Sequence, residues 1–190
     1  MRRHVVLFLR APMLGTGKRR LAAEIGDVAA LRFQRLMLAR LVRRLGRDRR
    51  WRLRVALTPD HARLPGIATV KQGRGDLGVR MERALAACPP GPKILVGADI
   101  PELSAAHIAA AVRLLGRHDV VFGPAADGGY WLVGVRHRPP TFGNVRWSSP
   151  HALADTLGNL PGRISVGFAG TLSDVDDAAS YRRLRRRQGF

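Results

Sequence analysis

Short runs of apolar residues alternate along the chain with longer segments in which apolar residues recur every three or four positions. Residues 4–9, HVVLFL, form such a run, which is typical of a strand buried on both faces of a sheet. Within residues 27–45 the hydrophobic positions share one face of a helix, and most of the arginines lie elsewhere. The same reasoning predicts further strands at residues 51–58, 69–71, 93–96, 120–122, 130–135 and 164–168, and further helices at 76–87, 104–115, 149–157 and 177–187.

This alternation predicts a fold in which a mostly parallel sheet carries helices on both faces. Ligands of such folds bind beyond the carboxyl ends of the strands. Three informative segments follow predicted strands: a loop at residues 10–20, Asp99 after strand 93–96, and Asp127 shortly after strand 120–122. We therefore expect one functional site at this edge of the sheet.

Length and composition narrow the class of protein. The chain has 190 residues, of which 46% are hydrophobic and 25% charged, as expected for a single globular domain. Its one cysteine, Cys88, excludes an internal disulfide framework. No apolar run approaches the ~18 residues that a membrane span needs, and the run that ends at Arg10 is too short for an export signal. We expect a cytoplasmic protein with no membrane span.

The charge balance is unusual, with 33 basic residues against 14 acidic ones and a net charge of +19. One interpretation is a non-enzymatic protein that binds a polyanion such as nucleic acid. The other is a solvated surface on which arginine replaces lysine. Nucleic-acid modules usually interleave aromatic residues with basic ones, whereas aromatic residues make up only 6% of this chain. The sequence therefore favours the solvated surface over a nucleic-acid partner.

Two glycine-containing segments could bind a nucleotide. Residues 12–21, PMLGTGKRRL, lack the first glycine and the Ser/Thr of a P-loop, but their backbone amides, Lys18 and Arg20 could bind a phosphate. Residues 72–81, QGRGDLGVRM, place three glycines at a helix entry, and the Gln72 amide could pair with a nucleobase edge. The alternatives are an ordinary surface loop for the first segment, and a turn with a helix capped by Asp76 for the second.

Three acidic positions could serve a metal ion or an acceptor. Asp99, directly after a buried strand, suits Mg²⁺, which prefers one or two carboxylates together with substrate oxygens. Residues 123–132, GPAADGGYWL, combine Asp127 with glycines and aromatic residues and suggest a substrate wall, although Asp-Gly is also a hairpin-turn signal. The acidic run 174–177, DVDD, could complete the metal site or could simply begin the last helix.

Together these motifs resemble one family, the GT-A-type transferases called rSAM/selenodomain-associated transferase 1, which are often labelled glycosyltransferases. The shared elements run in order from residue 5 to about residue 183: P-x-x-G-x-x-K-x-R-L at 12–21, Q-G-x-G-D-L-G-x-R-M at 72–81, G-x-D-x-P at 97–101, G-P-x-x-D-G-G-Y at 123–130, W-S at 147–148 and D-x-D at 174–176. Arg19 stands where that family usually has threonine. The chain is similar, more distantly, to the phospholactate and molybdenum-cofactor guanylyltransferases.

The resemblance implies a single-domain, three-layer α/β/α GT-A fold, which is a Rossmann-like fold of nucleotide-diphospho-sugar transferases with a mostly parallel mixed sheet. A nucleotide donor would bind about residues 1–100, and a small-molecule acceptor about residues 101–190. A Mg²⁺ or Mn²⁺ ion would bind Asp99 and Asp176, or Asp174 or Asp177 in place of Asp176. The nucleotide-binding residues would be Pro12, Gly15, Gly17, Lys18, Arg20, Gln72, Gly73, Gly75 and Asp76. The acceptor-binding residues would be Asp127, Gly128, Gly129, Tyr130 and Trp147, and the catalytic residues Asp99, Lys18 and Asp127.

Two reactions fit this expectation. Glycosyl transfer from a nucleotide sugar follows from the family label. Nucleotidyl transfer from a nucleoside triphosphate to a small phosphorylated acceptor is favoured by the chain length, by the single Asp99 in place of a D-x-D pair, and by the segment Lys18-x-Arg20. A transferase fold that has lost activity, with Arg19 altering the site, is a third possibility beside the polyanion binder.

Overall fold

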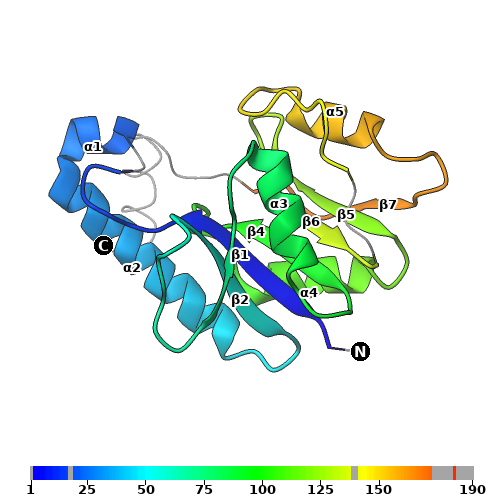
Figure 1. Ribbon diagram of the computed structural model, residues 1–190, viewed down its shortest axis with the longest axis horizontal. Helices are drawn as coiled ribbons and strands as arrows, with labels where there is room; N and C mark the ends of the chain where they lie inside the picture. The colour runs from blue at the N-terminus through cyan, green and yellow to red at the C-terminus, as the bar shows by residue number, and fades with distance from the viewer. Residues whose placement is uncertain (1, 17–18, 138–140, 173–181, 183–190) are drawn as a thin grey trace.

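Seven strands form one mixed sheet in this computed structural model, which describes residues 2–16, 19–137, 141–172 and 182 (Figure 1). The strands are β1 (His4–Arg10), β2 (Arg52–Thr58), β3 (Ala68–Lys71), β4 (Lys93–Gly97), β5 (Val120–Pro124), β6 (Tyr130–Val135) and β7 (Val166–Phe168), in the spatial order β3-β2-β1-β4-β6-β5-β7. Every neighbouring pair is parallel except those of β6, which runs antiparallel to both β4 and β5. The predicted mostly parallel sheet is confirmed.

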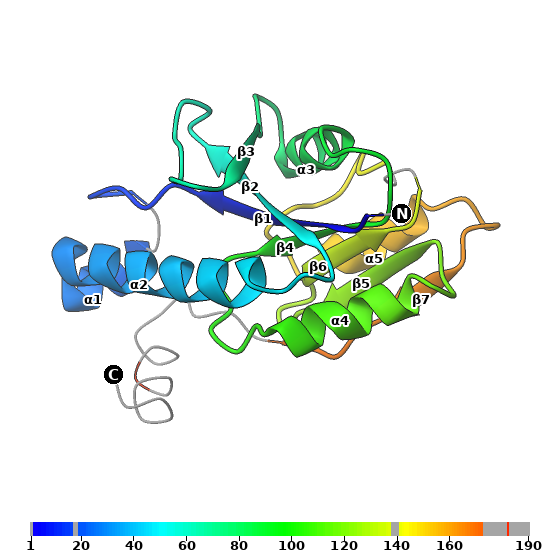
Figure 2. The same cartoon turned by 90° about the horizontal axis from the view of Figure 1, so that it is seen from below.

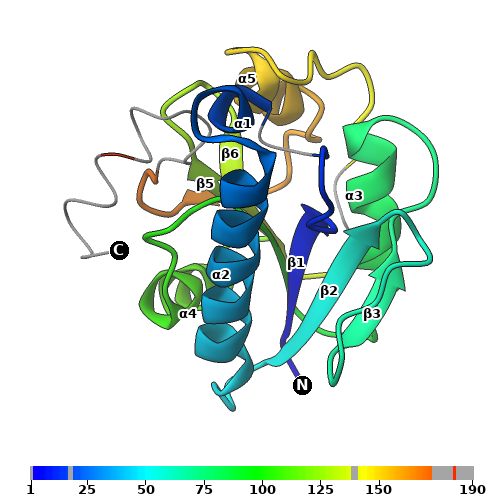
Figure 3. The ribbon, with the colours of Figure 1, turned by 90° about the vertical axis from the view of Figure 1, so that its left-hand side faces the viewer.

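Helices cover both faces of this sheet, as the pattern predicts. They are α1 (Arg19–Ile25), α2 (Asp27–Gly46), α3 (Leu77–Ala86), α4 (Ala105–Leu114) and α5 (Ala152–Gly158). Figures 2 and 3 show α2 and α4 on one face and α3 on the other, which gives three layers. Among the described residues, no helix combines the length and apolar character needed to cross a bilayer.

The two faces of the sheet bury separate hydrophobic clusters. Alternate residues of β1 belong to opposite clusters. Val5 and Leu7 pack with residues of α2 and α4, and Val6 packs with residues of α3. All three side chains are completely buried. A strand buried on both faces accounts for the uninterrupted apolar run at residues 4–9.

The structure departs from the predicted elements in three described places. Strand β7 begins at Val166 instead of residue 164. Residues 19–25 form helix α1, where the prediction has a loop up to residue 20 and no element at 21–26, because Leu21 is completely buried against Phe33 and Met37 of α2. Helix α5 begins at Ala152 instead of residue 149, because the Ser149 hydroxyl accepts the His151 N–H at 3.2 Å in a preceding turn. The predicted helix 177–187 lies outside the described residues.

The turn between β5 and β6 requires glycine at position 128. Gly128 has φ +84°, a conformation that side-chain-bearing residues rarely adopt. A Cβ atom there would lie 2.2 Å from the carbonyl oxygen of Pro150, so the turn packs against the segment that precedes α5. The Leu153 N–H also donates to the Gly128 carbonyl, at 3.1 Å.

Substituting alanine at this turn should therefore destabilise the protein. We expect Gly128→Ala to lower the free energy of unfolding by roughly 1–3 kcal/mol, because it adds backbone strain and displaces Pro150. The matched control is Gly162→Ala, since a Cβ at that exposed glycine meets no atom within 4 Å. Urea denaturation measures both variants, and equal stability of the two would contradict this role of Gly128.

Candidate functional site

A cleft of about 470 Å³ opens at the carboxyl edge of the sheet. We call it the carboxyl-edge cleft. It is lined by Leu77, Met81, Gly97, Asp99, Ile100, Ala125, Asp127, Gly129, Tyr130, Trp131, Trp147, Ser148, Ser149, Ala152 and Leu172. Asp99 comes from the segment that follows β4, and Asp127 from the β5–β6 turn. Two carboxylates that are distant in sequence therefore share one cleft, and both side chains are exposed.

A second, smaller hollow of about 50 Å³ extends the site on the other side of Asp99. Arg10, Pro12 and Asp99 are among its lining residues, together with residues of α2. Asp99 thus borders both hollows. Asp99 therefore borders the start of the segment 12–21 in the small hollow and shares the carboxyl-edge cleft with the β5–β6 turn.

The Asp127 carboxylate is positioned by its own turn. Its Oδ1 accepts the N–H of Gly129 at 3.0 Å, and the Ala125 N–H donates to the Gly129 carbonyl across the turn, also at 3.0 Å. Gly128 holds this turn against the segment before α5. The hairpin signal and the substrate-wall interpretation are therefore compatible, because the turn itself carries the carboxylate into the cleft.

Aromatic side chains form one wall of the cleft. The rings of Tyr130 and Trp147 meet edge to face with centroids 6.3 Å apart, and Tyr130 also packs against Phe122 at 5.1 Å. Burial raises the pKa of the Tyr130 hydroxyl, so this group stays neutral and can donate a hydrogen bond. The indole Nε1 of Trp147 is buried, with no hydrogen-bond partner within the described structure.

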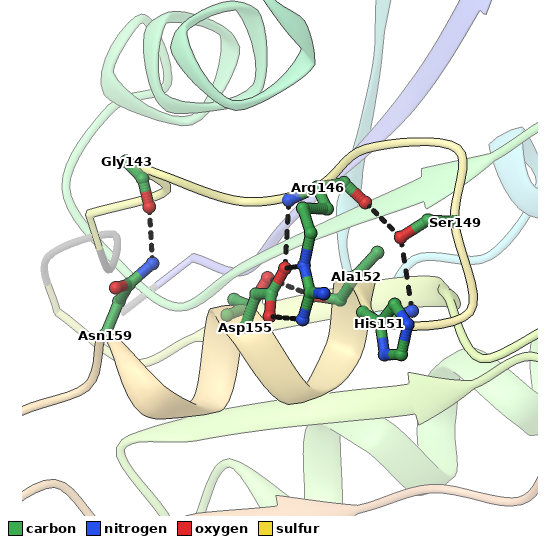
Figure 4. A network of polar contacts seen from close by, with 8 residues as sticks. Gly143, Arg146, Ser149, His151, Ala152, Asp155 and Asn159 are labelled. Atoms are coloured by element: carbon green, nitrogen blue, oxygen red, sulfur yellow. Dashed lines mark hydrogen bonds and ion pairs between the residues drawn. The ribbon is translucent and has the colours of Figure 1, made fainter.

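A network of polar contacts fastens the segment that carries Trp147 to helix α5 (Figure 4). Arg146 binds both carboxylate oxygens of Asp155, at 2.8 and 2.9 Å, and its backbone N–H donates to the same carboxylate. The Ser149 hydroxyl donates to the Arg146 carbonyl, and the Asn159 amide donates to the Gly143 carbonyl. The Arg146 guanidinium holds the pKa of Asp155 well below its usual range, so the pair stays ionised and the wall stays in place.

Gln72 directly follows β3, and its side chain is completely buried. Its amide nitrogen donates to the carbonyls of Leu9 and Ala56, at 2.9 and 2.7 Å, and its amide oxygen accepts from Arg80. Both hydrogens and the oxygen of this amide are therefore engaged inside the protein. The geometry favours a role in holding β1, β2 and α3 together over direct contact with a nucleobase.

The glycine-rich loop after β3 is held by groups from outside the motif. The Asp60 carboxylate accepts the N–H groups of Gln72 and Gly73, and these bonds, chiefly that from Gly73, lower the pKa of Asp60. The Arg83 guanidinium donates to the carbonyls of Gln72 and Arg74 and occupies the space where a Cβ of residue 73 would lie. The loop is thus tightly anchored from two sides.

The predicted site residues fall into three groups. Those that line the two hollows around Asp99 are Pro12, Asp99, Asp127, Gly129, Tyr130 and Trp147. Those that are described but line neither hollow are Gly15, Arg20, Gln72, Gly73, Gly75, Asp76 and Gly128. Asp76 caps α3 by accepting the Val79 N–H at 2.9 Å, as the alternative for that residue predicts. Those outside the described residues are Gly17, Lys18 and the acidic run with Asp174 and Asp176.

Three residues that organise the site, Asp60, Arg80 and Arg83, are absent from the predicted set. Asp60 follows the end of β2 by two residues and is one of only fourteen acidic residues, so its position after a strand could have marked it in the same way as Asp99. Arg80 lies inside the glycine-rich string of residues 72–81. Arg83 carries no local signal, because its role depends on the path of a loop nine residues earlier.

The described part of the chain holds no group of three or more Asp, Glu, His or Cys side chains that could bind a metal ion. Asp99 and Asp127 nevertheless share one exposed cleft. A magnesium-type site needs only one or two carboxylates when substrate phosphates supply further oxygens. Leu172, which lines the cleft, is the last described residue before the acidic run 174–177. The residues present therefore fit an ion held jointly by protein and substrate.

Comparison with known proteins identifies both a family and a fold. Residues 39–149 match the family described as "Uncharacterized protein conserved in bacteria (DUF2064)". No curated protein matches the chain. A structure from Desulfovibrio desulfuricans G20, assigned as a nucleotide-diphospho-sugar transferase, is 26% identical with a TM-score of 0.90, and the match covers 98% of this chain and 88% of that one.

Two further solved structures share the fold at lower identity. Rv0371c from Mycobacterium tuberculosis H37Rv, in complex with manganese, is 19% identical with a TM-score of 0.57, over 97% of this chain and 98% of that one. The CMP:2-keto-3-deoxy-manno-octonic acid synthetase in complex with CTP is 12% identical with a TM-score of 0.62, over 100% and 99% of the two chains. The nucleotide-diphospho-sugar transferase fold implied by the sequence is thus confirmed.

Removing the buried amide of Gln72 should mainly affect stability. Gln72→Ala leaves two carbonyls and a guanidinium without this partner, so we expect the free energy of unfolding to fall by about 2–4 kcal/mol. Gln34→Ala, which removes a half-buried amide on α2, serves as the control and should change stability little. Chemical denaturation provides the measurement. If the variant kept normal stability but changed its preference among nucleobases, the result would support direct contact between Gln72 and the base.

Proposed function

We propose a function from the premise that this chain belongs to the DUF2064 family of bacterial proteins and has the fold of nucleotide-diphospho-sugar transferases. In our proposal the protein is a metal-dependent transferase that uses a nucleotide sugar or a nucleoside triphosphate as donor. The observation that carries the proposal is the carboxyl-edge cleft, where Asp99 after β4 and Asp127 in the β5–β6 turn share one space beside an aromatic wall. Open α/β sheets bind their ligands at this edge.

The donor phosphates bind near the end of β1. Pro12 borders the small hollow next to Asp99, and the segment that follows contains Gly15, Gly17 and the cationic residues Lys18 and Arg20. Cationic side chains and backbone amides stabilise phosphate oxygens by charge-assisted hydrogen bonds. The loop of Gly73, Gly75 and Asp76, anchored by Asp60 and Arg83, completes the nucleotide-binding half.

Asp99 and Asp176 hold the Mg²⁺ or Mn²⁺ ion in this proposal. The ion supplies Lewis-acid stabilisation of the negative charge that develops on the leaving phosphate. The manganese complex of Rv0371c, a protein with the same fold, is consistent with such an ion. In this proposal Lys18 also contributes positive charge toward the donor phosphates, so the chemistry depends mainly on positioning and charge neutralisation.

The acceptor binds between the β5–β6 turn and the aromatic wall. Gly128 and Gly129 shape the turn, and the Tyr130 and Trp147 rings present apolar surface to the cleft beside it. The Asp127 carboxylate accepts the proton of the attacking acceptor group as general base. A small polar molecule with an apolar face suits this surface better than a polymer.

Two reactions remain within the proposal, and glycosyl transfer stands first because of the 26% identical structure assigned as a nucleotide-diphospho-sugar transferase. Nucleotidyl transfer to a small phosphorylated acceptor is the second candidate. It is favoured by the single carboxylate after β4, where the segment reads Gly97-Ala98-Asp99 and contains no D-x-D pair. The reactions differ in their leaving group, which makes them separable by experiment.

A donor screen followed by product analysis tests the proposal. We expect one of UDP-glucose, GTP, CTP or UTP to raise the melting temperature only when Mg²⁺ or Mn²⁺ is present, since ligands that bind the folded state stabilise it. That donor is then incubated with the enzyme and a small-molecule extract, and the products are analysed by mass spectrometry. Release of a nucleoside diphosphate indicates glycosyl transfer, and release of pyrophosphate indicates nucleotidyl transfer. Failure of every donor to bind would overturn the proposal.

Asp99 is the residue whose change should matter most. We expect Asp99→Asn to reduce metal-dependent turnover about 100-fold or more, because the amide cannot neutralise or bind the cation, while circular dichroism stays unchanged. Asp48→Asn is the matched control, because Asp48 pairs with Arg50 in the turn between α2 and β2, away from both hollows around Asp99. Full activity of Asp99→Asn would exclude Asp99 as a metal ligand.

A further inference from the structure

Basic side chains gather at the opposite, amino-terminal edge of the sheet. In the register of the three adjacent strands, His4 of β1 stands beside Arg52 of β2 and Lys93 of β4. Arg54 lies two residues further along β2 on the same face, because alternate strand residues share a face. None of these residues belongs to the proposed donor, metal or acceptor sites.

These residues border an open hollow of about 660 Å³, which we call the amino-edge hollow. It is lined by Arg2, His4, Arg52, Leu53, Arg54, Ala68, Pro89 and Pro90. No acidic side chain is among the described residues that line it. Three arginines and a histidine therefore face one space without a carboxylate to balance them.

Two of the side chains at the hollow are buried and poorly satisfied. The His4 side chain is 3% exposed; the Pro90 carbonyl interacts with its ring and favours the protonated form, but neither ring nitrogen makes a hydrogen bond of good geometry in the described structure. The Nε of Arg54 is likewise buried without one. Lys93 is only 7% exposed and lies beside His4 across the sheet. Such groups are costly unless a ligand satisfies them.

The hollow has a fixed wall. The chain from Cys88 to Pro92 reads Cys-Pro-Pro-Gly-Pro and passes directly over the start of β1, where the His4 N–H donates to the Pro92 carbonyl at 2.9 Å. Gly91 has φ +134°, and a Cβ there would lie 2.2 Å from the Arg2 carbonyl oxygen. This close approach buries His4, and the prolines restrict the backbone of the wall.

We propose that the amino-edge hollow is a second ligand site, which binds a phosphate-type oxyanion between His4, Arg52 and Arg54. A dianion would accept hydrogen bonds from the two guanidinium groups and from the imidazole, and it would offset the repulsion among these cations and Lys93. The ligand is either free phosphate or the phosphoryl group of a small metabolite. The site is independent of the proposed transferase function, since the two hollows lie at opposite edges of the sheet.

The protonation of His4 should report on this site. Burial lowers the pKa of His4, and the positive charges of Arg54, Lys93 and Arg2 lower it further, whereas the Pro90 carbonyl opposes the shift. The free imidazole is therefore neutral near pH 7, and a bound dianion favours its protonated form. Anion binding and proton uptake are thus coupled, so affinity increases as the pH falls.

The first experiment follows the His4 imidazole by NMR while sulfate, inorganic phosphate or glucose 6-phosphate is added. Sulfate stays a dianion across the pH range, so the pH dependence of its binding isolates His4. We expect saturable shifts of the His4 signals. Sulfate should bind more tightly at low pH, where His4 is protonated, than at high pH, by about tenfold for each unit by which the anion raises the pKa of His4. Tighter binding of glucose 6-phosphate than of phosphate indicates a metabolite ligand, and the reverse order indicates free phosphate. His4 signals unaffected by all three anions would overturn the proposal.

The second experiment compares Arg54→Gln and Lys93→Met with Arg43→Gln, which removes an exposed charge from α2 on the other face of the sheet. In anion-free buffer we expect Lys93→Met to melt at a higher temperature than the wild type, because it relieves repulsion between buried cations. Arg54→Gln should lose most of the His4 response to phosphate, because Arg54 lines the hollow, whereas Lys93→Met, which leaves the lining intact, and Arg43→Gln should keep it. An equal response in all three variants would contradict the site.

Discussion

The antiparallel strand β6 is the constraint on which the carboxyl-edge cleft depends. It lies between β4 and β5, which run parallel to each other, so the β5–β6 turn falls at the same edge of the sheet as the end of β4. Asp127 is thereby placed in the same cleft as Asp99. Trp131 of β6 packs closely over Gly123, and its indole N–H donates to the Gly170 carbonyl at 3.0 Å, which ties the segment after β7 to the same strand. A parallel β6 would have required a long crossover from the carboxyl edge to the amino edge in place of this short turn.

Much of this arrangement could be predicted from sequence patterns. The apolar runs locate the strands because strands of a covered parallel sheet are buried on both faces, and the carboxylates of Asp99 and Asp127 follow such runs. Helix α1 could not be predicted, because it depends on burial of Leu21 against α2. The inward position of Gln72 depends on the carbonyls of Leu9 and Ala56, which belong to other strands, and local sequence does not reveal that contact.

Acidic and basic side chains are distributed differently at the two edges of the sheet. Asp60, Asp76 and Asp155 each bind backbone N–H groups and so stabilise loops around the cleft, while Asp99 and Asp127 line it. The scarce carboxylates are thus concentrated where a cation and a phosphate donor would meet. In the amino-edge hollow no acidic side chain of the described lining balances the arginines, and the Nε of Arg54 is buried without a partner. The net charge of +19 therefore has a local structural counterpart away from the proposed active site.

In the proposed function a metal ion and a nucleotide donor meet beside Asp99. Crystals of the protein grown with Mn²⁺ and the donor that stabilises it would locate the ion, because the anomalous scattering of manganese identifies its position without prior assumptions. We expect an anomalous peak within coordination distance of the Asp99 carboxylate and of a donor phosphate oxygen, in the carboxyl-edge cleft. A donor bound with its manganese ion elsewhere on the molecule would contradict this proposal.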